Sequence, residues 1–249
     1  MLTLENVKKS FGQLRAVDGV SLTVPAGQII GLIGPNGSGK STLLSIIAGS
    51  QPADSGRILL EGRDITGLPA YQIYRLGLVR SYQDPALFFR MTALDNMLLP
   101  VKEQRGEDPA HAPLHRTWRA EESHNAHNAG ATLDQLQLWQ AYDTLAADLS
   151  GGQMKLLELG RSLMGAPRIL LLDEPTAGVA PALAYTIFEQ IEAMRRTHGL
   201  TFLIVEHRLE ILFDFVDHLY VMHLGNVIAQ GTPDEIAANT QVREVYFGE

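Results

Sequence analysis

The sequence predicts an α/β fold: a mixed sheet with an N-terminal antiparallel β part and a helical insertion. Three observations lead to this prediction. Short apolar runs such as Ile169–Leu172 and Thr201–Val205 have the length and composition of buried strands. Leucines at helical spacing fill Met154–Met164, which Pro167 ends. A polar stretch rich in histidine, alanine and proline separates the first group of strands from the second.

The expected elements follow in chain order. We expect strands at Leu2–Val7, Val20–Val24, Gln28–Ile33, Arg57–Gly62, Leu78–Tyr82, Ile169–Leu172 and Thr201–Val205, with a turn at Phe11 and Gly12 between the first two. We expect helices at Leu43–Ala48 and Met154–Met164, and helical periodicity resumes at Ala131–Leu138. The prediction is one domain, 1–249, with a core formed by 1–87 and 166–249 and a helical subdomain at 88–165.

Residues 34–42 carry the clearest chemical signal. They match G-x-x-x-x-G-K-[ST] in full, between an expected strand and an expected helix: Gly34, Pro35, Asn36, Gly37, Ser38, Gly39, Lys40, Ser41 and Thr42. Such a loop turns successive N–H groups toward one anion at the positive end of a helix. Lys40 can then reach the outer phosphates, and the Ser41 hydroxyl can serve Mg²⁺. Glycines often only make turns, but a simple turn does not require nine matching positions. The sequence predicts a P-loop NTPase core that binds a nucleoside triphosphate.

Two apolar strands end in polar residues. Asp173 and Glu174 follow Ile169–Leu172, and His207 follows Thr201–Val205 after Glu206. Ligands of open α/β sheets bind at the carboxyl ends of the strands. We therefore expect Asp173 beside a metal ion and Glu174 beside the terminal phosphate, with His207 converging on the same place.

A second loop of small residues opens the helix at Met154–Met164. Its residues are Leu149, Ser150, Gly151, Gly152 and Gln153. A helix N-terminus of this kind favours an anion, so the loop is a second candidate phosphate site. Ser-Gly-Gly is equally typical of a turn without a function.

Phe11 and the histidines of the polar stretch each allow two interpretations. Phe11 is either a core anchor or a ring that stacks on adenine. Four histidines have helical spacing and could pair on one face: His111, His115, His124 and His127. Since no set of carboxylates or thiolates accompanies them, a solvated helix surface is the favoured interpretation.

Composition excludes several classes of function. With no cysteine, the chain has no disulfide and no thiolate metal site. A net charge of −8 argues against broad binding of nucleic acid, which depends on Lys and Arg. No stretch approaches the ~20 apolar residues of a membrane-spanning helix, and the N-terminus does not resemble a signal peptide. We expect a soluble cytoplasmic protein.

Taken together, these features resemble the nucleotide-binding subunit of an ABC transporter over essentially the whole chain. The most specific likeness is Leu149–Gln153, which matches the signature motif of that family and lies between the phosphate loop and Asp173. The resemblance implies an ABC ATPase fold, the cofactors ATP and Mg²⁺, and ATP hydrolysis that drives transport.

The resemblance also implies a role for each matching position. Phe11 stacks on adenine, Asp173 holds the Mg²⁺ shell, and Glu174 polarises the attacking water. Gln83 touches Mg²⁺ and faces the membrane subunit, and His207 contacts the terminal phosphate. The implied catalytic residues are Lys40, Gln83, Glu174 and His207, and the implied Mg²⁺ ligands are Ser41, Gln83 and Asp173.

Partners follow from the same resemblance. Two ATPase subunits stack head to tail, so that the signature residues act on ATP held by the opposite subunit: Ser150, Gly151, Gly152 and Gln153. The second subunit is a copy or a related chain. Integral membrane permease subunits and, indirectly, a substrate-binding protein complete the assembly, and no nucleic acid is involved. The expected location is the cytoplasmic face of the cell inner membrane, as a peripheral subunit.

Several segments narrow the resemblance to ATPases of branched-chain (hydrophobic) amino acid importers. They are Leu78–Gln83, Met91–Asn96, His111–Leu114, Val205–His207 and Val242–Gly248. ATPases for urea or amide import and for lipopolysaccharide export share much of the tail pattern, so both stay open. A soluble ABC ATPase outside transport is a further alternative, although such proteins usually carry tandem halves, a coiled coil or a basic surface.

Two local features bear on the partners. After Glu174–Gly178 most family members have a hydrophobic residue, Asp and Pro, whereas this chain has Val179–Pro181 with Ala180 in place of Asp. The missing carboxylate puts the coupling of the two ATP sites in doubt, not the chemistry. The apolar run Leu87–Phe89 either fills the core or lines a groove for a short helix of the membrane subunit.

Overall fold

The computed structural model describes residues 1–82 and 86–247, which fold as two compact units. The first unit comprises Met1–Gln83, Arg168–Ala177 and Ala184–Glu249, and the second comprises Asp84–Pro167 and Gly178–Leu183. The predicted insertion, 88–165, lies within the second unit.

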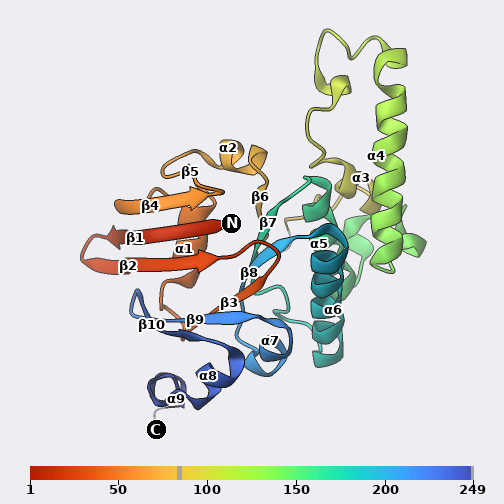
Figure 1. Cartoon of the computed structure of the whole chain (residues 1–249). Helices are drawn as coiled ribbons and strands as arrows, with labels where there is room; N and C mark the ends of the chain where they lie inside the picture. The colour runs from red at the N-terminus through yellow and green to blue at the C-terminus, as the bar shows by residue number, and fades with distance from the viewer. Residues whose placement is uncertain (83–85, 248–249) are drawn as a thin grey trace. The chain divides into compact units, whose positions relative to one another are not determined.

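The first unit contains two sheets (Figure 1). Its strands are β1 Leu2–Phe11, β2 Leu14–Val24, β3 Ile29–Ile33, β4 Ser55–Leu60, β5 Arg63–Asp64, β6 Leu78–Arg80, β7 Ile169–Asp173, β8 Thr201–Val205, β9 His218–His223 and β10 Asn226–Gly231. The antiparallel sheet has the order β2-β1-β4-β5, and the mixed sheet has the order β10-β9-β3-β8-β7-β6. The predicted α/β class with an antiparallel N-terminal part is confirmed.

Helices surround these sheets and extend into the C-terminal part. They are α1 Lys40–Ile47, α2 Ala70–Arg75, α7 Leu209–Phe215, α8 Pro233–Ala238 and α9 Thr240–Phe247, together with α6 Pro181–His198, whose first turn belongs to the second unit. The core of the first unit lies between the sheets, where Leu43, Leu44 and Ile47 of α1 are completely buried. Burying such a side chain stabilises the fold by about 1.5–3 kcal/mol.

The strands at the centre of the mixed sheet decide where polar residues gather. Strands β3, β8 and β7 are parallel neighbours, and every one of their residues is buried. This is the reason for their unbroken apolar sequences, since helices cover both faces of such a sheet. Because the strands are parallel, the loops that follow them leave from one edge.

The N-terminal hairpin is longer than the sequence analysis predicted. The prediction ended the first strand at Val7, but β1 continues to Phe11 and β2 begins at Leu14. Charged residues fit this part of the sheet because they are paired: Lys8 with Asp18 at 3.5 Å, and the buried Lys9 with Asp54 at 2.8 Å. The hairpin of β9 and β10 and the helices after it were not predicted.

The second unit is mostly helical. Its elements are α3 Ala93–Leu98, η1 Arg105–Glu107, α4 His115–Gln135, η2 Trp139–Ala141, η3 Ala146–Asp148 and α5 Gly151–Met164. Met97, Leu133 and Leu157 are fully buried and form its core with neighbouring leucines. Helix α4 ends at Gln135, so the predicted helix at Ala131–Leu138 extends too far.

The four histidines of the second unit are exposed, as expected for a solvated surface. His111 precedes α4 and contacts Asp108 at 2.6 Å, whereas the other three lie on α4. Among the residues that the structure describes, no group of three or more His, Cys, Asp or Glu side chains could hold a metal ion.

Ala180 directly precedes α6, whose first residue is Pro181. Proline is favoured at the first position of a helix, and the position before it favours a side chain that accepts from free N–H groups. We expect Ala180→Asp and Ala180→Asn to raise the free energy of unfolding by about 0.5–2 kcal/mol. Urea denaturation of the isolated chain measures the effect. Ala180→Glu adds charge without a good cap and is the control; equal stability of all four proteins contradicts the capping role.

Candidate functional site

The carboxyl ends of β3, β7 and β8 lead into one cavity of about 280 Å³ in the first unit. Side chains from the hairpin, the phosphate loop and the two later strand ends line it: Phe11, Leu14, Ala16, Asn36, Gly37, Gly39, Lys40, Ser41, Thr42, Glu174 and His207. Phe11 is 48% exposed, so it is not a core anchor, and it lines the cavity with the Lys9 ammonium 5.5 Å from its ring centroid.

The loop between β3 and α1 requires glycine at two places. A Cβ on Gly34 would lie 2.1 Å from the carbonyl oxygen of Met222, and one on Gly39 would lie 2.1 Å from that of Ala16. Both residues also have positive φ, 150° and 104°. The loop is therefore held against the backbone of neighbouring strands. The N-terminal end of α1, with its free N–H groups, faces the cavity.

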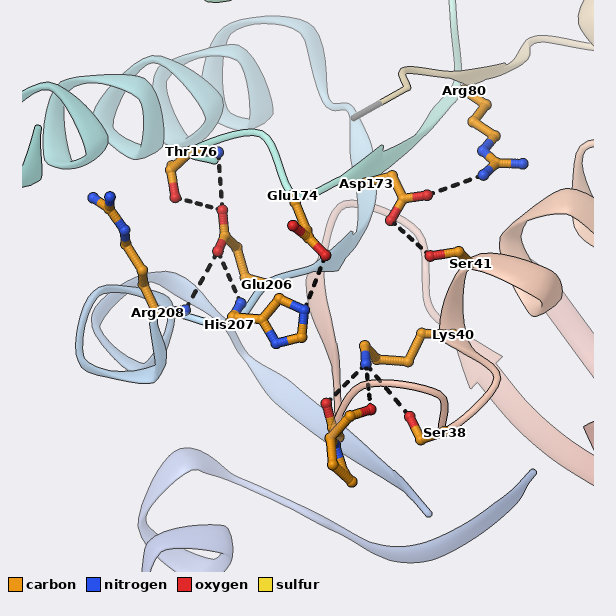
Figure 2. A network of polar contacts seen from close by, with 12 residues as sticks. Ser38, Lys40, Ser41, Arg80, Asp173, Glu174, Thr176, Glu206, His207 and Arg208 are labelled. Atoms are coloured by element: carbon orange, nitrogen blue, oxygen red, sulfur yellow. Dashed lines mark hydrogen bonds and ion pairs between the residues drawn. The ribbon is translucent and has the colours of Figure 1, made fainter. Parts of the chain in front are cut away.

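Lys40 is almost completely buried, with an exposed fraction of 5%. Its ammonium donates to the carbonyl oxygens of Gly34 at 2.8 Å and Pro35 at 3.0 Å, within the loop itself (Figure 2). Burial lowers the pKa of Lys40, although the charges of Glu174 and Asp173 oppose that shift. The cation thus stands at the base of the loop where phosphate oxygens would lie.

Asp173 ends β7 with both carboxylate oxygens engaged. One accepts from the Ser41 hydroxyl at 3.3 Å, and the other pairs with the Arg80 guanidinium at 3.0 Å. Asp173 and Ser41 offer hard oxygen ligands close together, which is the chemistry that Mg²⁺ selects. These residues fit a magnesium ion brought with a nucleotide.

Glu174 and His207 meet at the end of neighbouring strands. Glu174 Oε1 and His207 Nε2 share a hydrogen bond of 2.9 Å (Figure 2). Glu174 has φ of 51°, the left-handed region that a residue with a side chain rarely adopts. Such backbone strain costs about 1–3 kcal/mol and is typical of functional sites.

Glu206 connects the two loops that carry this pair. Its side chain is buried at 2% exposure and accepts from the backbone N–H groups of Thr176 at 2.9 Å, His207 at 2.9 Å and Arg208 at 3.4 Å. It also accepts from the Thr176 hydroxyl at 2.5 Å. One carboxylate therefore fixes the chain after Glu174 and the start of the His207 loop. The sequence analysis gave Glu206 no role, although a carboxylate directly after a buried strand was a usable signal.

Tyr246 on α9 lies near the phosphate loop. Burial raises the pKa of Tyr246 to about 12, and the nearby backbone of Gly34 opposes that shift. Nothing in the local sequence around Tyr246 indicates this proximity, because the two residues lie far apart in the first unit's sequence.

The remaining predicted site residues lie elsewhere. Gln83 lies outside the described residues. The signature residues belong to the second unit, where Ser150 begins α5 with a capping box. The Ser150 hydroxyl accepts from Gln153 N–H at 3.3 Å, and the Gln153 amide oxygen accepts from Ser150 N–H at 2.9 Å. A Cβ on Gly152 would lie 2.1 Å from the end of the Leu183 side chain, so a larger residue there would displace that side chain.

Comparison with known families agrees with this geometry. The profile described as "ABC transporter" matches residues 17–177. This chain belongs to the ABC transporter family. A second profile, described as "Branched-chain amino acid ATP-binding cassette transporter", matches residues 226–249. The family membership makes the chain a nucleotide-binding, ATP-hydrolysing transporter ATPase.

Full-length relatives and solved structures support the membership of this ABC ATPase. A probable branched-chain amino acid transport ATP-binding protein of Methanocaldococcus jannaschii is 43% identical, covering 100% of this chain and 98% of that protein. A high-affinity branched-chain amino acid transport ATP-binding protein of Escherichia coli is 34% identical over 100% and 98%. A nucleotide-free ATP-binding cassette superposes with a TM-score of 0.87 at 42% identity, covering 100% and 99%.

A second solved cassette of an ABC transporter, in its ADP conformation, gives the same TM-score of 0.87 at 43% identity, with 100% and 99% covered.

A search of the described residues found no helix with the length and apolarity that crossing a membrane demands.

We expect Glu206→Gln to destabilise the ATPase by about 1–3 kcal/mol, because the new NH₂ group faces backbone donors in either orientation. Turnover should fall while the KM for ATP changes little, since the phosphate loop is untouched. Chemical denaturation and steady-state kinetics measure both effects. Glu189→Gln, an exposed carboxylate on α6, is the matched control. Unchanged stability and turnover in Glu206→Gln would remove its positioning role.

Proposed function

We propose that this chain is the ATPase subunit that powers a membrane importer for branched-chain or other hydrophobic amino acids. The observation that carries the proposal is the convergence of Lys40, Asp173 and the Glu174–His207 pair on one edge of the sheet. The transport names of the full-length relatives and the match of the C-terminal segment support the choice of substrate.

The chain's own residues would divide the work of phosphoryl transfer, in which positioning and charge stabilisation dominate. The loop N–H groups and Lys40 hold the β- and γ-phosphates, and Phe11 offers its exposed ring to adenine. Glu174 orients and activates water, and His207 holds Glu174 and contacts the terminal phosphate. Ser41, Asp173 and Gln83 would hold Mg²⁺, which neutralises charge on the phosphates.

A second ATPase subunit completes each site in this proposal. The signature residues Ser150, Gly151, Gly152 and Gln153 begin α5, a helix of 14 residues, and its N-terminus favours an anion. Head-to-tail stacking of two subunits would bring them to ATP on the partner. Permease subunits would place the dimer at the cytoplasmic face of the inner membrane, and a substrate-binding protein would deliver the amino acid from the other side.

An exposed aromatic surface on the second unit fits a permease helix. Leu87 is buried, whereas Phe88 and Phe89 are 51% and 50% exposed, so the apolar run divides between core and surface. The segment 142–147 runs alongside this run. The Ala147 N–H donates to the carbonyl oxygen of Phe89 at 3.1 Å. Other exposed apolar side chains lie on this segment and before it: Trp139, Tyr142 and Leu145.

Asn96 holds this surface in place. Its side chain is completely buried, accepts from Phe88 N–H at 2.8 Å, and donates to the carbonyl oxygens of Phe88 and Thr92 at 3.1 and 2.9 Å. The turn therefore keeps its shape without burying the two rings. Exposed apolar patches on a fixed backbone are typical of sites that receive a helix.

Reconstitution tests the proposed transport. The chain, its partner ATPase and the permease subunits in liposomes, supplied with binding protein, should hydrolyse ATP and take up labelled leucine in step. Uptake of urea without leucine uptake would favour an amide importer. ATPase activity that needs no membrane subunit and responds to no solute would favour a soluble ABC ATPase.

We expect Glu174→Gln to lower ATP turnover about 10²–10⁴-fold, since it removes a general base. ATP affinity should stay near that of the wild type, and an ATP-bound dimer should accumulate in sedimentation. Lys40→Ala is the contrasting variant: deleting its charge should weaken nucleotide binding itself, measured by calorimetry. Hydrolysis at the wild-type rate in Glu174→Gln would remove Glu174 from the chemistry.

We expect Phe88→Asp and Phe89→Asp to abolish copurification with the permease while the isolated subunit still folds and binds ATP. A carboxylate buried unpaired in an apolar interface costs several kcal/mol, but these exposed positions can hydrate it in the free subunit. Leu224→Asp, at a 74% exposed apolar residue of the first unit, is the control. If the two Phe variants unfold, the rings belong to the core instead.

A further inference from the structure

Arg80 lies beside the proposed metal site, and the sequence analysis gave this charged residue no role. It ends β6, and its side chain is only 8% exposed, beside Asp173 at 7%. The guanidinium donates to the Asp173 carboxylate at 3.0 Å and to the Ser45 hydroxyl at 2.7 Å (Figure 2 shows the first contact). It thus connects β6, β7 and α1.

The face of the guanidinium is also occupied. Its central carbon lies 4.9 Å from the centroid of the Tyr82 ring, a cation–π geometry. Ser45 is fixed in turn, because its hydroxyl donates to the carbonyl oxygen of Ser41 at 2.7 Å, one turn earlier in α1. Arg80 therefore has little freedom to leave the carboxylate.

The charges of the site show what this contact does. Asp173 and Glu174 carry two negative charges, and Lys40 and Arg80 carry two positive ones. Without Arg80 the same cluster has a net charge of −1. A partly buried anionic cluster with oxygen ligands attracts divalent cations. With Arg80 in place, the Asp173 oxygen that does not face Ser41 is already neutralised.

We propose that Arg80 is a positioning residue that fixes Asp173 and prevents it from capturing a divalent cation before the nucleotide binds. Magnesium would then enter together with ATP, whose phosphates supply the missing ligands. The proposal rests on the proposed role of Asp173 as a Mg²⁺ ligand. The ligand role alone does not say when the metal binds. The proposal adds that nucleotide and metal bind together, at a carboxylate that is already in position.

Arginine suits this position better than lysine. Two nitrogens of its planar fork point to different elements, Ser45 on α1 and Asp173 on β7. A lysine ammonium is a point charge on a flexible stem and does not reproduce both directions. Arg80→Lys should therefore keep the neutralisation of Asp173 but loosen its position.

Binding of Mn²⁺ alone, without nucleotide, tests the proposal by electron paramagnetic resonance on the full chain. We expect Arg80→Gln to bind free Mn²⁺ at least about tenfold more tightly than the wild type, which is about 1.4 kcal/mol. Asp173→Asn in the Arg80→Gln background should abolish the gain. Arg57→Gln, which removes an exposed arginine paired with Asp64, should match the wild type.

A second measurement covers loss of folding. Arg80→Lys retains the charge, so it should bind free Mn²⁺ as weakly as the wild type while its turnover falls with little change in the KM for ATP. Equal Mn²⁺ affinity in folded Arg80→Gln and the wild type overturns the proposal, as does tight Mn²⁺ binding by Arg80→Lys. If Arg80→Gln does not fold, the turnover of Arg80→Lys decides, because an unchanged turnover would overturn the positioning role.

Asp173→Asn alone separates this proposal from the one on which it rests. If Mg²⁺ strengthens ATP binding by the wild type but not by this variant, Asp173 is the metal ligand and only the Arg80 measurements bear on the inference. If Asp173→Asn keeps the wild-type dependence of ATP binding on Mg²⁺, the ligand role itself fails.

Discussion

Mutual neutralisation of buried charges is the constraint on which the site depends. Lys40, Arg80 and Asp173 are each nearly inaccessible to water, and Glu174 is only partly accessible. A buried charge without a partner costs several kcal/mol, so none of these side chains is tolerable alone. The fold keeps them because the loop carbonyls hold Lys40 and the carboxylate of Asp173 holds Arg80. The side chains of the site therefore hold one another in place as a set.

The strained backbone at Glu174 needs similar support. Its φ is 51°, and its N–H donates to the carbonyl oxygen of Val205 at 2.9 Å, which holds the residue against β8. Glu206 holds the chain two residues later, at Thr176, and so prevents the turn from relaxing. The hydrogen bonds of one buried carboxylate offset the strain that aims Glu174 at His207. The position of the proposed general base thus depends on a residue that would touch neither nucleotide nor water.

The sequence was sufficient where the signal is local. The glycines of the phosphate loop and the apolar runs of β7 and β8 predict their own structures, and the strand-end rule then places Asp173 and His207 together. Contacts between distant segments were out of reach. Arg80 and Asp173 are 93 residues apart, and Thr176 and Glu206 are 30 apart, with no periodicity to connect them. The hairpin of β9 and β10 was missed because nothing in the local sequence of either strand indicates the strand with which it pairs.

Buried polar groups serve different purposes in the two units. In the first unit such groups draw charged side chains inward to a cavity, whereas in the second the fully buried Asn96 satisfies the backbone of a turn so that Phe88 and Phe89 can face outward. Hiding both rings would stabilise an isolated chain by a few kcal/mol. The proposed docking of a permease helix on this turn accounts for both features: the rings stay exposed, and Asn96 keeps the turn rigid.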